Sequence, residues 1–252
     1  MLLQYCSDLH LEFPENKKWL SRNPLQPNAP VLVLAGDIVP FTEMRKHQDF
    51  FDELSANFEV TYWIPGNHEY YHGNLSERSG SFSEKIRENV VLLNNQSVIH
   101  DGVKLVFSTL WSRIGIANEW QIERSLNDFH VIRNEDRFFS VEDFNKLHED
   151  GLGFLHEALN DDDHLKKVVV THHAPTFYNY PPEYKTSELN GAFATELYDF
   201  IEECGAKNWI YGHIHYNTQS FKIGDTTLIT NQMGYVRNGE HKGFELAKVV
   251  EV

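Results

Sequence analysis

The sequence predicts an α/β fold, because short apolar runs typical of buried strands alternate with longer segments of helical periodicity. Residues 31–35 (VLVLA) form a continuous apolar run, as expected for a central strand that is covered on both faces. Residues 43–58 and 141–159 place apolar side chains at helical spacing, which predicts two amphipathic helices. Five of the predicted strands end in a polar cluster, and in open α/β sheets ligands bind outside the carboxyl ends of the strands.

The remaining regular elements follow from the same two periodicities. Further strands are expected at residues 1–6, 60–64, 90–93, 97–99, 104–107, 167–171, 208–211 and 247–252. The pair Asp101-Gly102 predicts a hairpin turn between the fourth and fifth of these, and Gly224-Asp225 predicts a second hairpin. A third helix is expected at about residues 191–203.

Three segments have no strong periodicity. Residues 13–30 contain four of the nine prolines and are expected to form a surface loop. Residues 76–88 are polar with weak helical character. Residues 110–140 are expected to form an insertion of loops and helices.

The composition is that of a globular protein. The chain has 252 residues, 41% of them hydrophobic and 23% charged, which is enough for a sizeable core. No apolar run approaches 18 residues, so no membrane span is expected. The polar clusters extend from residue 8 to residue 215, so we expect one domain that spans residues 1–252.

Cysteine usage and charge restrict the setting and the partners. Cys6 and Cys204 make neither a disulfide framework nor a CxxC pair, and we expect buried free thiols. Because Asp8 stands so near the start, no room is left for a cleaved leader, and we expect a cytoplasmic location. The net charge of −15 argues against a nucleic-acid partner, since binding the phosphate backbone needs clustered Lys and Arg. Bound divalent metals would still make one cleft positive.

The polar clusters at the strand ends predict a metal centre. The clusters are Asp8 with His10, Asp37, Asn67 with His68, His172 with His173, and His213 with His215. Residues two apart face the same way in an extended backbone. Carboxylate, imidazole and amide donors without thiolate suit manganese, iron or zinc. Seven of these nine residues are candidate ligands, which is more than the roughly four that a structural zinc takes. Two ions about 3.5–4 Å apart with a bridging carboxylate are therefore expected.

Taken together, the motifs resemble those of the calcineurin-like metallophosphoesterases along nearly the whole chain. The motifs are Asp8-x-His10, Gly36-Asp37, Gly66-Asn67-His68-Glu69, His172-His173 and Gly212-His213-x-His215. The resemblance implies a four-layer α/β/β/α sandwich of two mixed β-sheets flanked by helices, with two divalent or trivalent metal ions.

The resemblance also implies the role of each residue. One metal would be held by Asp8, His10 and His215, the other by Asn67, His172 and His213, with Asp37 bridging them. A bridging hydroxide would attack phosphorus. His68 would donate a proton to the leaving group or stabilise the transition state.

One motif departs from the protein Ser/Thr phosphatase branch. That branch continues its second motif as G-D-x-V-D-R-G, whereas this chain continues with Ile38-Val39-Pro40-Phe41 after Asp37. The difference favours a small-molecule phosphoester, with a phosphodiester preferred. A phosphomonoesterase, a nuclease and a metal-binding scaffold without activity remain as alternatives. The complete set of candidate ligands favours catalysis, and the sparse basic residues at 76–88 disfavour a nuclease.

Several polar residues near the motifs carry two interpretations. Glu69 is expected to orient the turn or a ligand, and His173 to be structural rather than a ligand. The role of His72 stays open. Two groups are expected either to line the substrate pocket or to pack their own loops: Phe129, His130 and Arg133, with Arg133 gripping a phosphate oxygen, and Tyr178, Tyr180 and Pro181. The remaining histidines are expected at the surface or in turns: His47, His100, His148, His156, His164 and His241.

Overall fold

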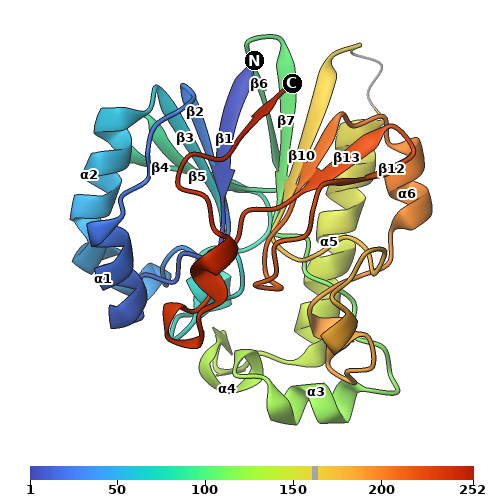
Figure 1. Ribbon diagram of the computed structural model, residues 1–252. Helices are drawn as coiled ribbons and strands as arrows, with labels where there is room; N and C mark the ends of the chain where they lie inside the picture. The colour runs from blue at the N-terminus through green and yellow to red at the C-terminus, as the bar shows by residue number, and fades with distance from the viewer. Residues whose placement is uncertain (161–163) are drawn as a thin grey trace.

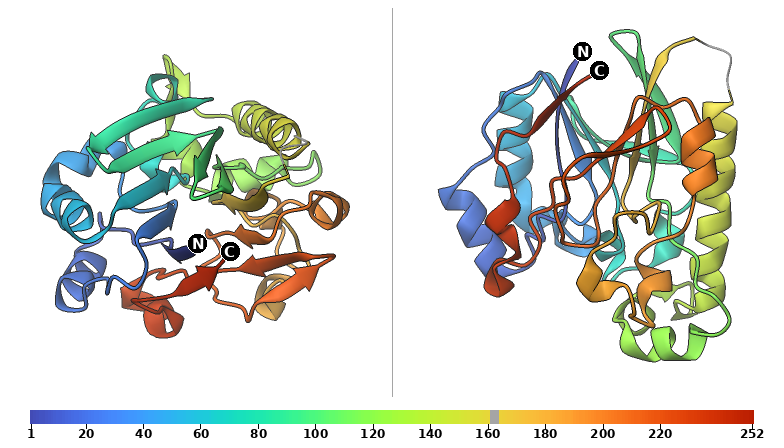
Figure 2. Two further views of the ribbon diagram at one scale, coloured as in Figure 1. Left: turned by 90° about the horizontal axis from the view of Figure 1, so that it is seen from above. Right: turned by 45° about the vertical axis from the view of Figure 1, so that its right-hand side comes forward.

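Two six-stranded β-sheets lie face to face, and helices cover the outer face of each sheet (Figure 1). The computed structural model describes residues 1–160 and 164–252. Figure 2 shows the same layers from two further directions, with the two sheets between the helices. The predicted α/β/β/α sandwich of two mixed sheets is confirmed.

The first sheet is built from the N-terminal part of the chain and one C-terminal strand. Its strand order is β14-β1-β2-β3-β5-β4. The strands are β1 (Leu2–Cys6), β2 (Val31–Ala35), β3 (Val60–Ile64), β4 (Phe82–Arg87), β5 (Val90–Asn94) and β14 (Val249–Glu251). The four inner strands are parallel and both edge strands are antiparallel to their neighbours. The carboxyl ends of β1, β2 and β3 therefore lie at one edge.

The second sheet repeats this plan. Its strand order is β12-β13-β11-β10-β7-β6, again with four parallel inner strands and antiparallel edges. The strands are β6 (Gln96–His100), β7 (Val103–Ser108), β10 (Lys166–Thr171), β11 (Asn208–Ile210), β12 (Phe221–Ile223) and β13 (Thr226–Ile229). Both predicted hairpins are present, as β6 with β7 and β12 with β13.

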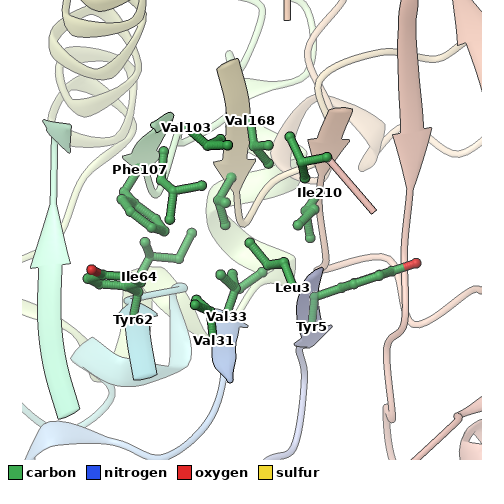
Figure 3. Packing of buried hydrophobic residues seen from close by; sticks show 14 of the residues in the cluster. Leu3, Tyr5, Val31, Val33, Tyr62, Ile64, Val103, Phe107, Val168 and Ile210 are labelled. Carbon is green, nitrogen blue, oxygen red and sulfur yellow. The ribbon is translucent and has the colours of Figure 1, made fainter. Parts of the chain in front are cut away.

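The main core lies between the sheets, where aliphatic and aromatic side chains of both sheets interdigitate (Figure 3). Val31 and Val33 of β2 point into this core, and the alternate residues Leu32 and Leu34 pack against the outer helices. Both faces of β2 are thus buried, which is why its sequence is a continuous apolar run. Each such fully buried side chain contributes roughly 1.5–3 kcal/mol of hydrophobic stabilisation.

Four helices form the two outer layers. On the first sheet lie α1 (Pro14–Arg22) and α2 (Gln48–Asn57), and on the second α5 (Val141–Leu159) and α6 (Tyr198–Glu203). Helix α5 has the predicted bounds, because Ser140 and Asp143 form a reciprocal capping box at its start. None of the helices described is long and apolar enough to cross a membrane.

Four segments differ from the sequence expectation. Residues 13–30 are not all loop, because Pro14 occupies the first turn of α1, where its missing N–H costs nothing. The polar segment at 76–88 contains the edge strand β4, whose side chains alternate in exposure. The helix expected at 191–203 is confined to α6, and a short 3₁₀ turn, η5 (Asn190–Ala192), precedes it. The segment at 43–58 begins as the 3₁₀ helix η1 (Phe41–His47) before α2.

The segment at 110–140 is an insertion of short elements, as predicted. It contains α3 (Glu119–Ser125), α4 (Asp128–Val131) and the two-stranded pair β8 (Arg133–Asn134) and β9 (Arg137–Phe138). These elements pack on a separate apolar cluster that includes Trp111 and Phe144. In Figure 1 the helices α3 and α4 lie below the two sheets. The other short 3₁₀ helices are η2 (His68–Tyr70), η3 (Leu75–Glu77), η4 (Pro182–Tyr184), η6 (Val236–Asn238) and η7 (Glu240–Gly243).

Candidate metal centre

The strand ends bring the candidate ligands of both sheets together. Asp8 and His10 follow β1, Asp37 follows β2, Asn67 follows β3, His172 follows β10, and His213 and His215 follow β11. Three groups have one donor atom of each residue within 4.8 Å of the others, and one of them is His10, Glu12 and His68. The two groups made only of candidate ligands are Asp8, His10, Asp37 and His215, and Asp37, His172 and His213. The side chains in these groups are buried, apart from the partly exposed His215. Each group is able to hold a metal ion.

Asp37 belongs to both groups and presents one carboxylate oxygen to each. Its Oδ2 lies 3.7 Å from Nε2 of His10, and its Oδ1 lies 3.4 Å from Nε2 of His172. Nε2 of His10 is 2.9 Å from Nε2 of His215, and Nε2 of His172 is 3.0 Å from Nδ1 of His213. Ligand nitrogens about 2.0–2.1 Å from a zinc ion lie only slightly further apart than this. The spacing therefore fits two cations with a shared carboxylate.

Each histidine of the two groups directs its other ring nitrogen to an acceptor. Nδ1 of His10 faces Glu12 at 3.2 Å and Nδ1 of His215 faces Glu240 at 2.8 Å. Nδ1 of His172 faces a backbone carbonyl at 2.8 Å, and Nε2 of His213 faces another at 3.2 Å. Carboxylate and carbonyl oxygens only accept, so these nitrogens carry the protons. The nitrogens that face the groups are therefore the ones that would give up a proton to bind a cation.

Asn67 offers an amide oxygen as a further candidate ligand and lines the same cleft as Asp37 and His213. Its Nδ2 donates to Oδ1 of Asp128 at 2.9 Å, and the same oxygen accepts from the hydroxyl of Tyr71 at 2.6 Å. The amide is thereby oriented, and its Oδ1 is buried without a hydrogen-bond partner among the described residues. A buried carbonyl oxygen without a partner is costly unless a cation binds it. This atom is the strongest single sign that the residues present fit a metal.

The backbone at the site is strained. Five candidate ligands have positive φ angles: Asp8 (58°), His10 (48°), Asp37 (56°), His213 (73°) and His215 (49°). Such conformations cost roughly 1–3 kcal/mol each and cluster at functional sites. The side chains of residues two apart were expected to face the same way because the backbone is extended there, and that reason is wrong. The pairs still converge, because tertiary hydrogen bonds such as His10 N to Asp37 O (2.9 Å) fix these turns.

Glu69 ties two strand ends together. Its Oε1 accepts from the N–H of Ile38 (2.7 Å) and from Nε1 of Trp63 (3.1 Å). Its Oε2 accepts from the N–H of Asp37 (2.9 Å) and of Gly66 (2.6 Å). Burial and the charge of Asp37 raise the pKa of Glu69 to about 7, against the lowering effect of the backbone donors. Glu69 therefore orients both the turn and Asp37.

His68 lies at the edge of the two groups. Its Nδ1 is 2.8 Å from Oε1 of Glu12, its Nε2 is 3.4 Å from the hydroxyl of Tyr235, and its ring stacks on Tyr71 at 4.0 Å. Burial lowers the pKa of His68, but the charges of Asp37 and Glu12 outweigh it, and the net pKa is raised. The ring is thus placed to hold and release a proton next to the candidate ligands.

A cleft of about 410 Å³ opens over the two groups. Its walls are rich in rings: Tyr71, Tyr180, Tyr184, Phe193 and Tyr235. Asp128 and Glu240 also reach it, and no Lys or Arg is among the described residues that line it. Tyr180 therefore belongs to the cleft, whereas Tyr178 packs against Tyr198 and Phe221 outside it.

Other residues singled out by the sequence lie away from the cleft. The guanidinium of Arg133 lies over Phe138 and donates to the carbonyl of Asp136, and Phe129 is buried within the insertion. The packing interpretation of that segment therefore holds. His130 is exposed and, like His72, is absent from the cleft lining.

Three histidines outside the two groups are buried. His173 is fully buried, with its ring 4.1 Å from that of His213 and 5.2 Å from that of Trp111. His47 and His148 were expected at the surface or in turns, and that expectation is wrong, because both are buried and lie in helices. His47 is 3% exposed, and His148 donates from Nδ1 to a backbone carbonyl inside the insertion.

The sequence reasoning missed the supporting acids and rings: Glu12, Tyr71, Asp128, Tyr235 and Glu240. Only Glu12 has a local signal, because it continues the spacing of two after Asp8 and His10. Asp128 and Glu240 stand in segments without a motif, 61 positions from Asn67 and 25 positions from His215, the candidate ligands that they contact.

Comparison with known proteins agrees with this geometry. An uncharacterised protein, L509, of Acanthamoeba polyphaga mimivirus is 32% identical over 263 residues, which cover 93% of this chain and 91% of L509. The crystal structure of phosphopantetheinyl hydrolase (PptH) from Mycobacterium tuberculosis has the same fold, with a TM-score of 0.72 at 19% identity, covering 98% of this chain and 95% of PptH. The family profile described as calcineurin-like phosphoesterase matches residues 4–217. The chain therefore belongs to the calcineurin-like phosphoesterase family.

Proposed function

We propose that this protein hydrolyses a small phosphodiester with the help of two metal ions, within one domain that spans the chain. The observation that carries the proposal is Asp37, whose two oxygens face two separate groups of donors. When bound, a pair of manganese, iron or zinc ions would supply Lewis-acid charge and activate water for attack on phosphorus.

The proposed ligand assignment follows the two groups. Asp8, His10 and His215 hold one ion, and Asn67, His172 and His213 hold the other. Asp37 binds both. The carboxylates and carbonyls behind the histidines hold each ring in the tautomer that binding needs.

His68 is proposed to donate the proton that the leaving group requires. Its Nε2 is directed toward Tyr235 at the cleft, and its opposite nitrogen is held by Glu12. A positioned general acid contributes roughly 10²–10⁴-fold to a rate.

The charge of the cleft supports a diester over a monoester. A phosphodiester carries one negative charge, whereas a monoester carries up to two near neutral pH. The described cleft residues include two acids besides the ligands and no Lys or Arg to offset a second substrate charge. The ring-rich walls favour an ester with a flat or apolar substituent. We further propose that the protein acts in the cytoplasm on small molecules.

The test is a paired assay on manganese-loaded protein. Hydrolysis of bis(4-nitrophenyl) phosphate is compared with hydrolysis of 4-nitrophenyl phosphate, and bound metal is measured by elemental analysis. We expect faster cleavage of the diester. Faster cleavage of the monoester would make the protein a phosphatase, and no cleavage of either by protein with two bound metals would contradict the proposal. Arg133→Ala serves as a control variant. The Arg133 side chain lies outside the cleft, so its removal is expected to leave the rates for both esters unchanged.

A further inference from the structure

Glu12 makes a contact that the expected ligand set does not explain. It follows His10 by two residues, and its side chain is 13% exposed. One oxygen, Oε1, lies 3.2 Å from Nδ1 of His10 and 2.8 Å from Nδ1 of His68. The shorter of the two bonds therefore joins Glu12 to a histidine that is not a candidate ligand.

We infer that Glu12 is the positioning residue of the acid catalyst: its carboxylate holds the ring of His68 so that Nε2 faces the leaving group. The inference rests on the proposed phosphodiesterase function. A carboxylate oxygen only accepts hydrogen bonds, so both imidazoles donate to it from Nδ1. For His68 this leaves Nε2 as the nitrogen that exchanges a proton with the cleft.

The ring of His68 is restrained on two further sides. Its face stacks on Tyr71 at 4.0 Å, with 23° between the ring planes. Its Nε2 lies 3.4 Å from the hydroxyl of Tyr235, which lines the cleft. Turning the His68 ring over about its side-chain bonds would break the hydrogen bond to Glu12, whereas the stacking on Tyr71 does not depend on which ring nitrogen points outward. Glu12 is thus the contact that selects which nitrogen points outward.

The proton transfer that this geometry serves is balanced. As the bond between phosphorus and the leaving-group oxygen breaks, its electron pair stays on that oxygen, and the proton on Nε2 of His68 moves to it. The oxygen of one water molecule becomes bonded to phosphorus, so a diester and water give a monoester and an alcohol. His68 regains its proton from the water that is consumed. Glu12 is not altered.

Glu240 provides a matched control within the same site. It too accepts from Nδ1 of a candidate ligand, His215, at 2.8 Å, and its other described bonds go to Tyr235 N and Asn238. It has no described hydrogen bond to His68. Removing Glu240 and removing Glu12 should therefore disturb metal binding alike, but only the loss of Glu12 should disturb His68.

The first experiment measures the dependence of the rate on the leaving group. Diesters with a 4-nitrophenyl leaving group need little protonation, and diesters with a phenyl leaving group need more. We expect Glu12→Ala to lose roughly 10–100-fold on the phenyl ester and much less on the nitrophenyl ester, at equal metal content. Glu240→Ala is expected to lower both rates by the same factor. The double variant Glu12→Ala/His68→Ala should be slower than His68→Ala alone only by the factor that Glu240→Ala costs, because the contact with His10 is still lost. Fully additive losses would overturn the inference.

The second measurement does not depend on activity. In zinc-loaded protein labelled with ¹⁵N-histidine, we expect Nδ1 of His68 to be protonated in the wild type. The Nδ1-protonated fraction should fall in Glu12→Ala and stay unchanged in Glu240→Ala. An unchanged pattern in Glu12→Ala would overturn the inference. If Glu12→Ala does not fold, Glu12→Asp carries the same two comparisons, because its carboxylate is one methylene shorter.

The two proposals fail in different ways. If the wild type cleaves no diester, the proposed function fails, whatever the NMR spectra show. If the wild type cleaves diesters and the leaving-group dependence of Glu12→Ala equals that of the wild type, the proposed function stands and only the role of Glu12 is lost.

Discussion

Replacing Glu69 with glutamine tests whether this buried carboxylate holds the metal centre together. Glu69 accepts four hydrogen bonds, two at each oxygen, from residues that follow β2 and from the end of β3. Glutamine has nearly the same shape but only one acceptor oxygen. Its NH₂ group would face two N–H donors, so one pair of bonds is lost whichever way the amide turns.

The size of the effect follows from those two bonds. An unsatisfied buried donor costs about 1–3 kcal/mol, so two of them cost about 2–6 kcal/mol. Removing a buried charge next to Asp37 offsets part of this, because burial and that charge already raise the pKa of Glu69. We expect Glu69→Gln to lower the free energy of unfolding by about 2–4 kcal/mol, which lowers Tm by roughly 5–15 °C for a chain of this size.

Denaturant unfolding of metal-free protein gives this free energy without a contribution from bound ions. The control is Glu196→Gln, the same change at an exposed acceptor that bonds Thr176, Phe177 and Tyr198. Water replaces lost bonds there, and we expect a change within about 0.5 kcal/mol. We also expect Glu69→Gln to bind metal more weakly, because the backbone N–H of either Asp37 or the next residue, Ile38, loses its acceptor. A loss below about 1 kcal/mol with wild-type metal affinity would refute the reasoning.

The remaining predictions concern the metal ligands and the acid. Asp37→Ala is expected to lose metal and activity together, as measured by elemental analysis and turnover, and full activity would disprove its role. His68→Ala should keep its metal while turnover of a phenyl diester falls roughly 10²–10⁴-fold, whereas an unchanged rate on that ester would remove His68 from the mechanism. Asp128→Ala removes the acceptor that orients Asn67. We expect its metal affinity, measured by competition with a chelator, to fall roughly 10–100-fold, and an unchanged affinity would mean that Asn67 needs no such support.

Local patterns were sufficient for most of the strands and for the donor groups that follow them, whereas the four-layer arrangement was expected from the family resemblance. The apolar run at 31–35 predicted a strand buried on both faces, and its side chains do pack on both sides of β2. Helix α5 was predicted from its periodicity, and in the structure the capping box of Ser140 and Asp143 fixes its start. The clusters converge because they follow parallel strands, whose carboxyl ends meet at one edge.

Local patterns failed where burial was decided by a distant partner. β4 is mostly polar, with Phe82 and Ile86 as its apolar residues, and it forms a strand because β5 offers it an edge to pair with. α1 forms in a proline-rich segment because Leu20 is buried against the first sheet. His148 lies in a helix and is buried although it is polar, because a backbone carbonyl of the insertion accepts a hydrogen bond from its Nδ1.

The sequence by itself therefore determined most of the strands and helices in their order and which donor types follow the strands. Only the tertiary structure decided how those donors are aimed. Asp8 and Asp37 adopt left-handed turns that the sequence pattern does not indicate. The contact of Glu12 with His68 joins residues 56 positions apart, and that of Asp128 with Asn67 joins residues 61 positions apart. Periodicity reports neighbours within one element, whereas a hydrogen bond between loops depends on how the sheets stack, and that is set by the whole core at once.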